Sequence, residues 1–398
     1  SLVRETPNST GQLYTNPYAQ MVSGYQVNNA STINAQIEFK QDFGFWVPGL
    51  TARAMGYTQR YSFFSTTRQY NPFYYKADLT SQGVVLTPFN DGGNASIGTP
   101  GTEYLNYNEG EKKVSTAYYG EAVINYDRTF ADKHQVTGML IGTIRHSIVG
   151  NAGTLEGSLP SRNLGLSGRF TYGFDSRYLL EFNFGYNGTE RLAKEDRFGF
   201  FPAVSLGWVI SNEAFFEPMK NVVDNLKIRG SYGLVGSDDL ATAGGSYYLY
   251  IDKITNNDLS YLKWTSGQNM DYQLGGPQMA YYAMSGLGWE KVKKLDIGID
   301  FTLFRNWTFT FDYFYDKRYD IFMNREAWPQ SLAYHIAKPW SNIGKMDNKG
   351  VEFSINYANN FSKDLSVSLQ ANFTYNKNKM FDLSEKLVFD GLSVCSLV

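Results

Sequence analysis

The sequence predicts an all-β fold, an antiparallel up-and-down transmembrane β-barrel with short turns on one side of the wall and long loops on the other. Polar and apolar residues alternate with a period of two in many segments, which is typical of strands with two different faces. The links between these segments fall into a short and a long class, as in membrane barrels. Aromatic residues are abundant, with 30 Tyr and 28 Phe in 398 residues.

The segment 224–240, DNLKIRGSYGLVGSDDL, shows the alternation, because Leu226 and Ile228 alternate with Lys227 and Arg229. A soluble sandwich would bury the apolar face, whereas a membrane barrel turns it toward lipid. The same pattern in about twelve segments, with links of two lengths, favours the barrel. The side chains expected to face a watery lumen are Glu38, Glu121, Glu181, Lys227, Arg229, Asp296, Asp300 and Glu352.

Strands are expected in chain order along the whole sequence. Their ranges are 31–41, 50–61, 115–127, 135–145, 163–174, 178–187, 201–210, 224–240, 293–304, 308–317, 348–358 and 365–377. The links 43–49, 127–133, 174–177, 304–306 and 359–364 are short, and 211–224 is long enough for a helical turn. The segments 64–113, 236–288 and 322–346 are long. We interpret the short links as periplasmic turns and the long ones as extracellular loops.

Aromatic residues flank the short links. They are Phe43, Phe45, Trp46, Tyr126, Phe130, Phe174, Tyr178, Phe304, Trp307, Tyr357 and Phe361. Membrane barrels carry such girdles where the wall meets the lipid–water interface. Cross-strand packing next to a turn would place aromatic residues in the same positions. We favour the girdle and keep the packing interpretation open.

Composition argues against several other classes of protein. The net charge of −2 gives no general attraction to nucleic acid. Cys395 is the one cysteine, and the three histidines have no ligand-like spacing, so neither a metal nor a cofactor is expected. The sequence contains no run of about 20 apolar residues, so no membrane-spanning helix is predicted. We find no catalytic signature and expect no enzyme.

Several motifs resemble the SusC/RagA family of TonB-dependent outer-membrane transporters of the Bacteroidetes. They are FDSRYLLEFNFGYNGTERLAKEDRFGFFPAVSLGWVISNEAFF, DNLKIRGSYGLVGSDDL, LGWEKVKKLDIGIDFTLF and NIGKMDNKGVEFSINY. Their order and spacing also agree, and the resemblance covers roughly residues 16–379 outside the long loops. YNGTERLAKEDRFG departs from the family's usual D-G-S-S-R-F, and Ala203 replaces a common Ser.

The resemblance implies a barrel of about 22 strands. It also implies a signal peptide, a plug domain and a last strand ending in an aromatic residue. The first residues, SLVRETPNST, lack the apolar stretch of a signal peptide, and the last, DGLSVCSLV, do not resemble a closing strand. We therefore expect residues 1–398 to be a partial TonB-dependent transporter β-barrel domain.

The function that the resemblance implies is TonB-dependent import of an oligosaccharide through the bacterial outer membrane. Its implied partners are TonB, a SusD-like surface lipoprotein that covers the barrel, and the lipid bilayer, with a possible dimer of transporter–lid pairs. Three alternatives stay open. The first is a peptide importer of the same family, the second an outer-membrane barrel without energy coupling, and the third a secreted β protein that binds carbohydrate.

The long segment 236–288 is the candidate ligand-binding loop. Its aromatic residues alternate with Asp, Asn and Gln, and aromatic rings stack on the apolar faces of sugars while amides and carboxylates bind hydroxyls. The candidate residues are Tyr247, Tyr248, Tyr250, Trp264, Tyr272, Tyr281 and Tyr282. Packing of the loop against itself or against a lid protein would also favour tyrosine there.

Overall fold

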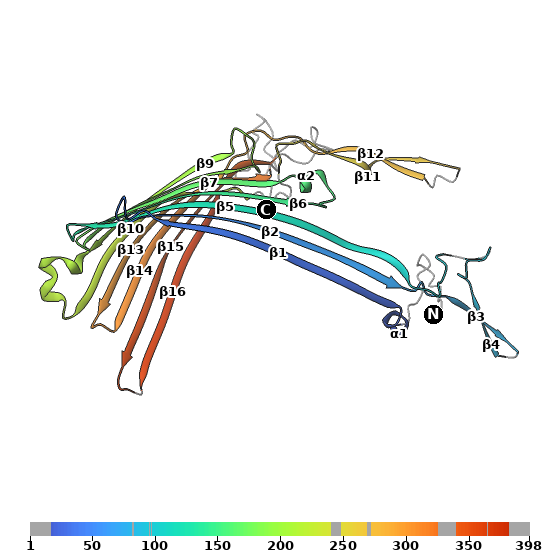
Figure 1. Cartoon of the computed structure of the whole chain (residues 1–398), viewed down its shortest axis with the longest axis horizontal. Helices are drawn as coiled ribbons and strands as arrows, with labels where there is room; N and C mark the ends of the chain where they lie inside the picture. The colour runs from blue at the N-terminus through green and yellow to red at the C-terminus, as the bar shows by residue number, and fades with distance from the viewer. Residues whose placement is uncertain are drawn as a thin grey trace, which may run out of the picture. The chain divides into compact units, whose positions relative to one another are not determined.

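The computed structural model describes residues 17–81, 83–94, 96, 98–239, 248–268, 272–324, 340–363 and 365–381. Its main element is a 12-stranded sheet in the order β1-β2-β5-β6-β7-β8-β9-β10-β13-β14-β15-β16 (Figure 1). Strand neighbours in the sheet are therefore mostly neighbours in the chain, which is the up-and-down order that the sequence predicts. The antiparallel all-β prediction is confirmed.

The strands of the main sheet match the predicted ranges and usually extend beyond them. Their bounds are β1 (Gly24–Asp42), β2 (Leu50–Gln69), β5 (Asn106–Phe130), β6 (His134–Val149), β7 (Ser161–Phe174), β8 (Tyr178–Thr189), β9 (Phe198–Val209), β10 (Val223–Ser237), β13 (Glu290–Leu303), β14 (Trp307–Asn324), β15 (Trp340–Asn360) and β16 (Ser366–Phe381). A barrel strand needs about 9–11 residues to cross a bilayer. The longest strands therefore exceed the bilayer requirement.

The short links form tight turns. Asp175 and Ser176 between β7 and β8 both have positive φ, and so do Phe304 and Arg305 between β13 and β14. Positive φ at both central residues defines the type I′ turn, whose twist matches that of the flanking strands. The link between β9 and β10 contains η1 (Ile210–Asn212) and η2 (Ala214–Met219), which confirms the expected helical turn.

Two of the long links, expected to be loops, contain two-stranded hairpins. β3 (Tyr75–Thr80) pairs with β4 (Gly83–Pro88), and β11 (Lys253–Ser266) pairs with β12 (Tyr272–Tyr281). The first pair is short, and the second has register shifts and a largely polar β11, so neither gives a strong period-two signal. The short helices α1 (Pro17–Met21) and α2 (Leu155–Ser158) complete the described elements.

The chain divides into two compact units. The first comprises Ser1–Ala35, Thr58–Ala117 and Ile148–Ser158, and the second comprises Gln36–Tyr57, Tyr118–Ser147 and Leu159–Val398. The candidate site lies within the second unit, which also contains the main buried apolar cluster. In the described part of the chain, no helix has the length and apolar character needed to cross a bilayer.

Candidate functional site

Charged side chains gather on one face of the sheet. The register places Lys227 on β10 opposite Asp300 on β13, and Arg229 returns to the same face because side chains alternate along a strand. On the next strands, Gly298 is opposite Asp312, and Asp312 is opposite Glu352. The predicted lumen residues that share this face are Glu181, Lys227, Arg229, Asp296, Asp300 and Glu352.

The guanidinium of Arg229 lies at the centre of this polar face. Its Nε lies 3.1 Å from Asp300 Oδ2, and its Nη1 lies 3.2 Å from Asp296 Oδ1. Its Nη2 lies 2.6 Å from Asp312 Oδ1 on β14. The planar guanidinium has five N–H donors and can serve several carboxylates at once. Three carboxylates around one cation leave this part of the face negatively charged.

A second group of charges joins β1, β2 and β5. Arg53 donates a short hydrogen bond to Glu121, and its Nη1 lies 3.9 Å from Glu38 Oε2. The hydroxyl of Tyr119 donates to the other carboxylate oxygen of Glu121 at 2.8 Å. The structure thus brings the predicted residues Glu38 and Glu121 together around one arginine.

The predicted residue Glu181 on β8 is also paired. Its carboxylate accepts hydrogen bonds from Arg169 at 2.8 Å and from Asn183 at 2.7 Å. Glu181 therefore lies beside a cation and an amide, on the same polar face as Asp296, Asp300 and Glu352. Arg53, Arg169 and Asp312 were not predicted from the sequence as residues of this polar face. Asp312 had a detectable signal, because it lies between Phe311 and Tyr313 at a position of the polar set in the predicted strand 308–317.

The opposite face of the sheet carries exposed apolar side chains. Leu206, Ile228 and Ile297 are 61%, 39% and 46% exposed. Within the residues that the structure describes, no second sheet packs over this face, since the two other sheets are the two-stranded hairpins. In a soluble sandwich these side chains would be buried between two layers. Their exposure is the arrangement expected of a barrel wall.

Aromatic residues beside the short links both stack and stand exposed. Trp307 and Tyr357 on neighbouring strands have ring centroids 4.5 Å apart, which is cross-strand packing. Phe45 and Trp46 in the first link are strongly exposed. Both interpretations of these residues thus have support, and their location at a lipid interface stays a prediction.

Glu213, in the link between β9 and β10, contacts residues of the neighbouring β7–β8 turn and of the adjacent strand ends. Its carboxylate accepts hydrogen bonds from the indole of Trp208 at 3.0 Å and from Arg177 at 3.1 Å. The rings of Trp208 and Tyr178 stack with centroids 6.4 Å apart. Hydrogen bonds from Tyr178, then Trp208, and then Arg177 lower the pKa of Glu213. Hydrogen bonds to Glu213 and Asp175 raise the pKa of Arg177. This cluster was not predicted from the sequence.

The predicted ligand-binding tyrosines divide into two groups. Tyr248 and Tyr281 are buried, at 6% and 9% exposed. The hydroxyl of Tyr248 donates to the carbonyl oxygen of Pro160 at 2.8 Å, and that of Tyr250 donates to the carbonyl oxygen of Glu190 at 2.9 Å. Burial of the ring is the main reason why the pKa of Tyr248 is raised. These contacts tie the segment to neighbouring links.

Tyr281 belongs to an apolar cluster formed by residues far apart in the sequence. The cluster residues are Leu192, Leu249, Tyr281, Leu287, Trp289 and Phe322. The indole of Trp289 also donates to the carbonyl oxygen of Arg197 at 3.3 Å. This cluster packs long links together, so packing accounts for the tyrosines on it. Tyr247 lies outside the described residues.

The other group is exposed. Trp264 on β11 is 72% exposed, and Tyr272 on β12 and Tyr282 after it are also exposed. Trp264 is opposite Leu274, and Ser266 is opposite Tyr272, so Trp264 and Tyr272 lie on the same face of the hairpin. Their rings are accessible to a ligand or a partner protein.

Among the described residues, no cluster of three or more His, Cys, Asp or Glu side chains could hold a metal ion. Nδ1 of His134 lies 2.8 Å from the hydroxyl of Tyr172, and the ring of His146 lies near Tyr118. His335 and Cys395 are outside the described part of the chain. The expectation that the chain uses no cofactor stays a prediction.

Comparisons with known proteins show which protein family this chain resembles. Residues 2–391 match the family model described as TonB dependent receptor-like, beta-barrel. TonB-dependent receptor P3 of Formosa agariphila is 27% identical over 407 residues, which cover 96% of this chain and 36% of that protein. TonB-dependent receptor SusC of Bacteroides thetaiotaomicron is 32% identical over 219 residues, which cover 54% of this chain and 20% of that protein.

The solved structure of the RagAB peptide transporter shares the fold. It superposes with a TM-score of 0.63 at 19% identity and covers 98% of this chain and 40% of that one. The chain therefore spans well under half the length of these relatives. The predicted resemblance to SusC/RagA-type proteins is confirmed.

Proposed function

The chain belongs to the TonB dependent receptor-like β-barrel family, and from this premise we propose that it forms part of the wall of a TonB-dependent importer of oligosaccharides. The SusC/RagA-type relatives are outer-membrane proteins, and so is this one. In this proposal, residues 1–398 are a partial barrel domain, in line with the 36% of the Formosa agariphila receptor that they cover.

The observation that carries the proposal is the two-faced sheet. Arg229 and its three aspartates occupy one face, while Leu206 and Ile297 stand exposed on the other. Charged groups are costly to bury in lipid, and exposed apolar area is costly in water at about 25 cal/mol per Å². Both costs are avoided when the charged face lines a water-filled lumen and the apolar face contacts the bilayer.

Cysteine accessibility tests this orientation. In a cysteine-free variant of the full-length protein that includes Cys395→Ser, single cysteines are introduced at Ser231 on the charged face or at Ile297 on the apolar face. The proposal predicts that a membrane-impermeant maleimide labels Ser231→Cys in outer-membrane vesicles and that lipid protects Ile297→Cys. Equal labelling at both positions would favour a soluble β protein.

The proposed partners are TonB, which would couple the inner-membrane energy source to transport, and a SusD-like surface lipoprotein. Named relatives support the first, since the Formosa agariphila and Bacteroides thetaiotaomicron proteins are TonB-dependent receptors. Similarity to SusC supports the second. A dimer of transporter–lid pairs is part of the same proposal. Affinity purification of the full-length protein from its outer membrane tests these partners directly.

The proposed substrate is an oligosaccharide that contacts exposed rings of the β11–β12 hairpin and the link after it. Trp264, Tyr272 and Tyr282 have accessible rings, and aromatic faces stack on the apolar faces of sugars. Tyr248, Tyr250 and Tyr281 would hold the loops that present these rings.

Peptide import is the second candidate, because the RagAB peptide transporter shares the fold. Growth of a deletion strain separates the two substrates. Loss of growth on one purified glycan, with unchanged growth on peptides, would support oligosaccharide import. The reverse result would support peptide import, and normal growth on every glycan and peptide tested would favour a barrel without energy coupling.

A further inference from the structure

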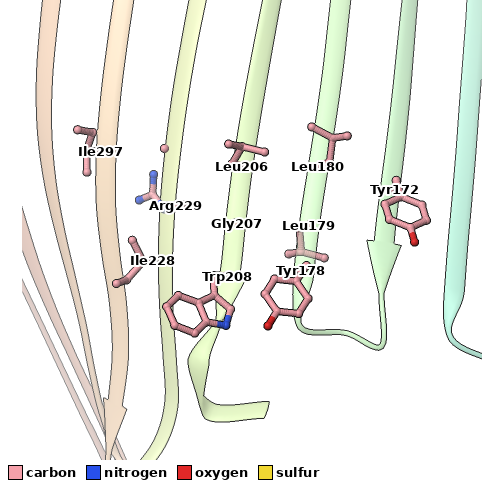
Figure 2. A pocket seen from close by; sticks show the side chains of 11 residues that line it. Tyr172, Tyr178, Leu179, Leu180, Leu206, Gly207, Trp208, Ile228, Arg229 and Ile297 are labelled. Carbon is pink, nitrogen blue, oxygen red and sulfur yellow. The ribbon is translucent and has the colours of Figure 1, made fainter. Parts of the chain in front are cut away.

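The apolar face of the sheet contains a groove between β7 and β13 (Figure 2). Its volume is about 720 Å³, within the range of about 300–1,000 Å³ that is typical of small-molecule sites. Leu180, Leu206, Ile228 and Ile297 line it with apolar side chains. The groove is open on one side, so a ligand would lie along the wall.

The absence of a side chain at Gly230 creates this groove. The register places Leu180 opposite Leu206, Leu206 opposite Gly230, and Gly230 opposite Ile297. Large side chains therefore stand on this row of the sheet except at Gly230. A Cβ at Gly230 would meet one atom within 4 Å, the carbonyl oxygen of Asp296 at 3.9 Å. The space over Gly230 is thus open and could accept a larger residue.

One end of the groove is aromatic and close to a short link. Trp208 and Tyr178 line this end, and their rings are nearly parallel, with an interplanar angle of 11°. The hydrogen bond from the indole of Trp208 to Glu213 fixes the tryptophan toward the link. Tryptophan and tyrosine favour the boundary between hydrocarbon and water. The aromatic end therefore marks the interfacial level, and the aliphatic part extends into hydrocarbon.

We propose that this groove binds one acyl chain of a phospholipid, with the headgroup beside Trp208 and Tyr178. The inference goes beyond import and rests on the proposed orientation of the wall. The guanidinium of Arg229 does not provide a charged contact, because it is engaged by Asp296, Asp300 and Asp312 on the opposite face. The nearly apolar lining excludes hydrated solutes, and the bilayer supplies acyl chains at high concentration.

Packing would hold this acyl chain. The acyl chain of a membrane lipid is already surrounded by hydrocarbon, so transfer from water contributes no free energy to its binding in the groove. A recessed surface offers more atoms at contact distance than a flat wall, and these small attractions add up along the chain. Filling the recess should therefore remove preferential binding without affecting general insertion into the bilayer.

Native mass spectrometry of the full-length protein tests the proposal. Delipidated protein in mild detergent receives limiting 1-palmitoyl-2-oleoyl-phosphatidylethanolamine, and the population with one bound lipid is measured. Gly230→Leu fills the groove. Gly142→Leu is the matched control, because Gly142 shares the apolar face with its partner Leu166, and a Cβ there would meet nothing within 4 Å. Resistance to unfolding in detergent verifies that both variants are folded.

The expected result is a population with one bound lipid that falls about tenfold in Gly230→Leu and is unchanged in Gly142→Leu. An unchanged population in Gly230→Leu, or an equal fall in both variants, would overturn the proposal. A wild-type dimer that Gly230→Leu dissociates without changing lipid binding would assign the groove to a second copy instead. The cysteine-accessibility experiment reports the orientation independently, so the two proposals can fail separately.

Discussion

Arg229 on β10 reaches across the intervening strand β13 to Asp312 on β14, with 2.6 Å between Nη2 and Oδ1. Gly298 makes this possible, because it lies opposite both residues in the register. A Cβ at Gly298 would lie 2.7 Å from Cζ of Arg229 and closer still to the Asp312 carboxylate. The glycine therefore leaves the space through which two non-adjacent strands form an ion pair.

The first prediction is that Gly298→Ala destabilises the sheet by about 1–3 kcal/mol, the usual cost of forcing extra atoms into a packed position. Both the guanidinium and the carboxylate would have to move, which separates the ion pair. Urea unfolding of the full-length protein in lipid vesicles, followed by tryptophan fluorescence, measures the change. Gly142→Ala is the control because its Cβ would meet nothing within 4 Å. Equal stability of Gly298→Ala and wild type would contradict this account.

The second prediction concerns the geometry of the cation. Arg229→Lys keeps the charge but lacks the planar fork that reaches Asp296, Asp300 and Asp312 together. We expect a loss of about 1–3 kcal/mol, between the values for surface and buried pairs, because the side chain of Arg229 is 34% exposed. A double-mutant cycle with Asp312→Asn isolates the direct contact. Additive losses would show that the two side chains are not coupled.

Strand order and the polar face were predictable because they depend on local alternation and link length. In β10, the period-two pattern from Leu226 to Arg229 assigns each residue to a face without knowledge of any partner strand. The ion pair between Arg229 and Asp312 was not predictable in the same way. It depends on the register of three strands and on a glycine whose role appears when those strands are paired.

The loop residues show the other limit of sequence reasoning. Tyr248 and Trp264 gave the same aromatic signal, but Tyr248 is buried and Trp264 is exposed. Long-range contacts determine which of these rings is buried, since the hydroxyl of Tyr248 donates a hydrogen bond to the carbonyl oxygen of Pro160, which is distant in the sequence. An alternating strand assigns its own faces, whereas an irregular loop has no such period. The hairpin pairing of β11 with β12 escaped prediction for the same reason.

The third prediction is a pH dependence at Glu213. Hydrogen bonds from Tyr178, Trp208 and Arg177 lower the pKa of its carboxyl in the folded protein. A group with a depressed folded pKa stabilises the protein above its unfolded pKa, about 4.3 for glutamate, and this stabilisation is lost as the pH falls through the folded value. Glu213→Gln should therefore lower Tm at pH 7, and the difference from wild type should shrink below about pH 4.3.

Thermal unfolding of the full-length protein in detergent at several pH values measures this effect. Glu217→Gln is the matched control, because Glu217 lies in the same link and pairs with Lys220 at an exposed position. The control should behave like wild type, since exposed ion pairs contribute little. A Tm difference between wild type and Glu213→Gln that stays constant from pH 7 to pH 3 would refute the assigned role of this carboxylate.

The fourth prediction tests the proposed contact between substrate and the β11–β12 hairpin. Trp264→Ala should weaken binding of an imported oligosaccharide by roughly two- to twelvefold, the equivalent of one aromatic contact worth about 0.5–1.5 kcal/mol. Isothermal titration calorimetry with the full-length protein measures this affinity.

The control is Trp46→Ala. It removes another exposed tryptophan, in the short link between β1 and β2, and should leave the affinity unchanged. If Trp264→Ala binds the oligosaccharide normally but no longer retains a surface lipoprotein during purification, the exposed rings belong to a protein interface. Because the substitution removes the same ring in both cases, the two measurements separate a sugar contact from a lid contact.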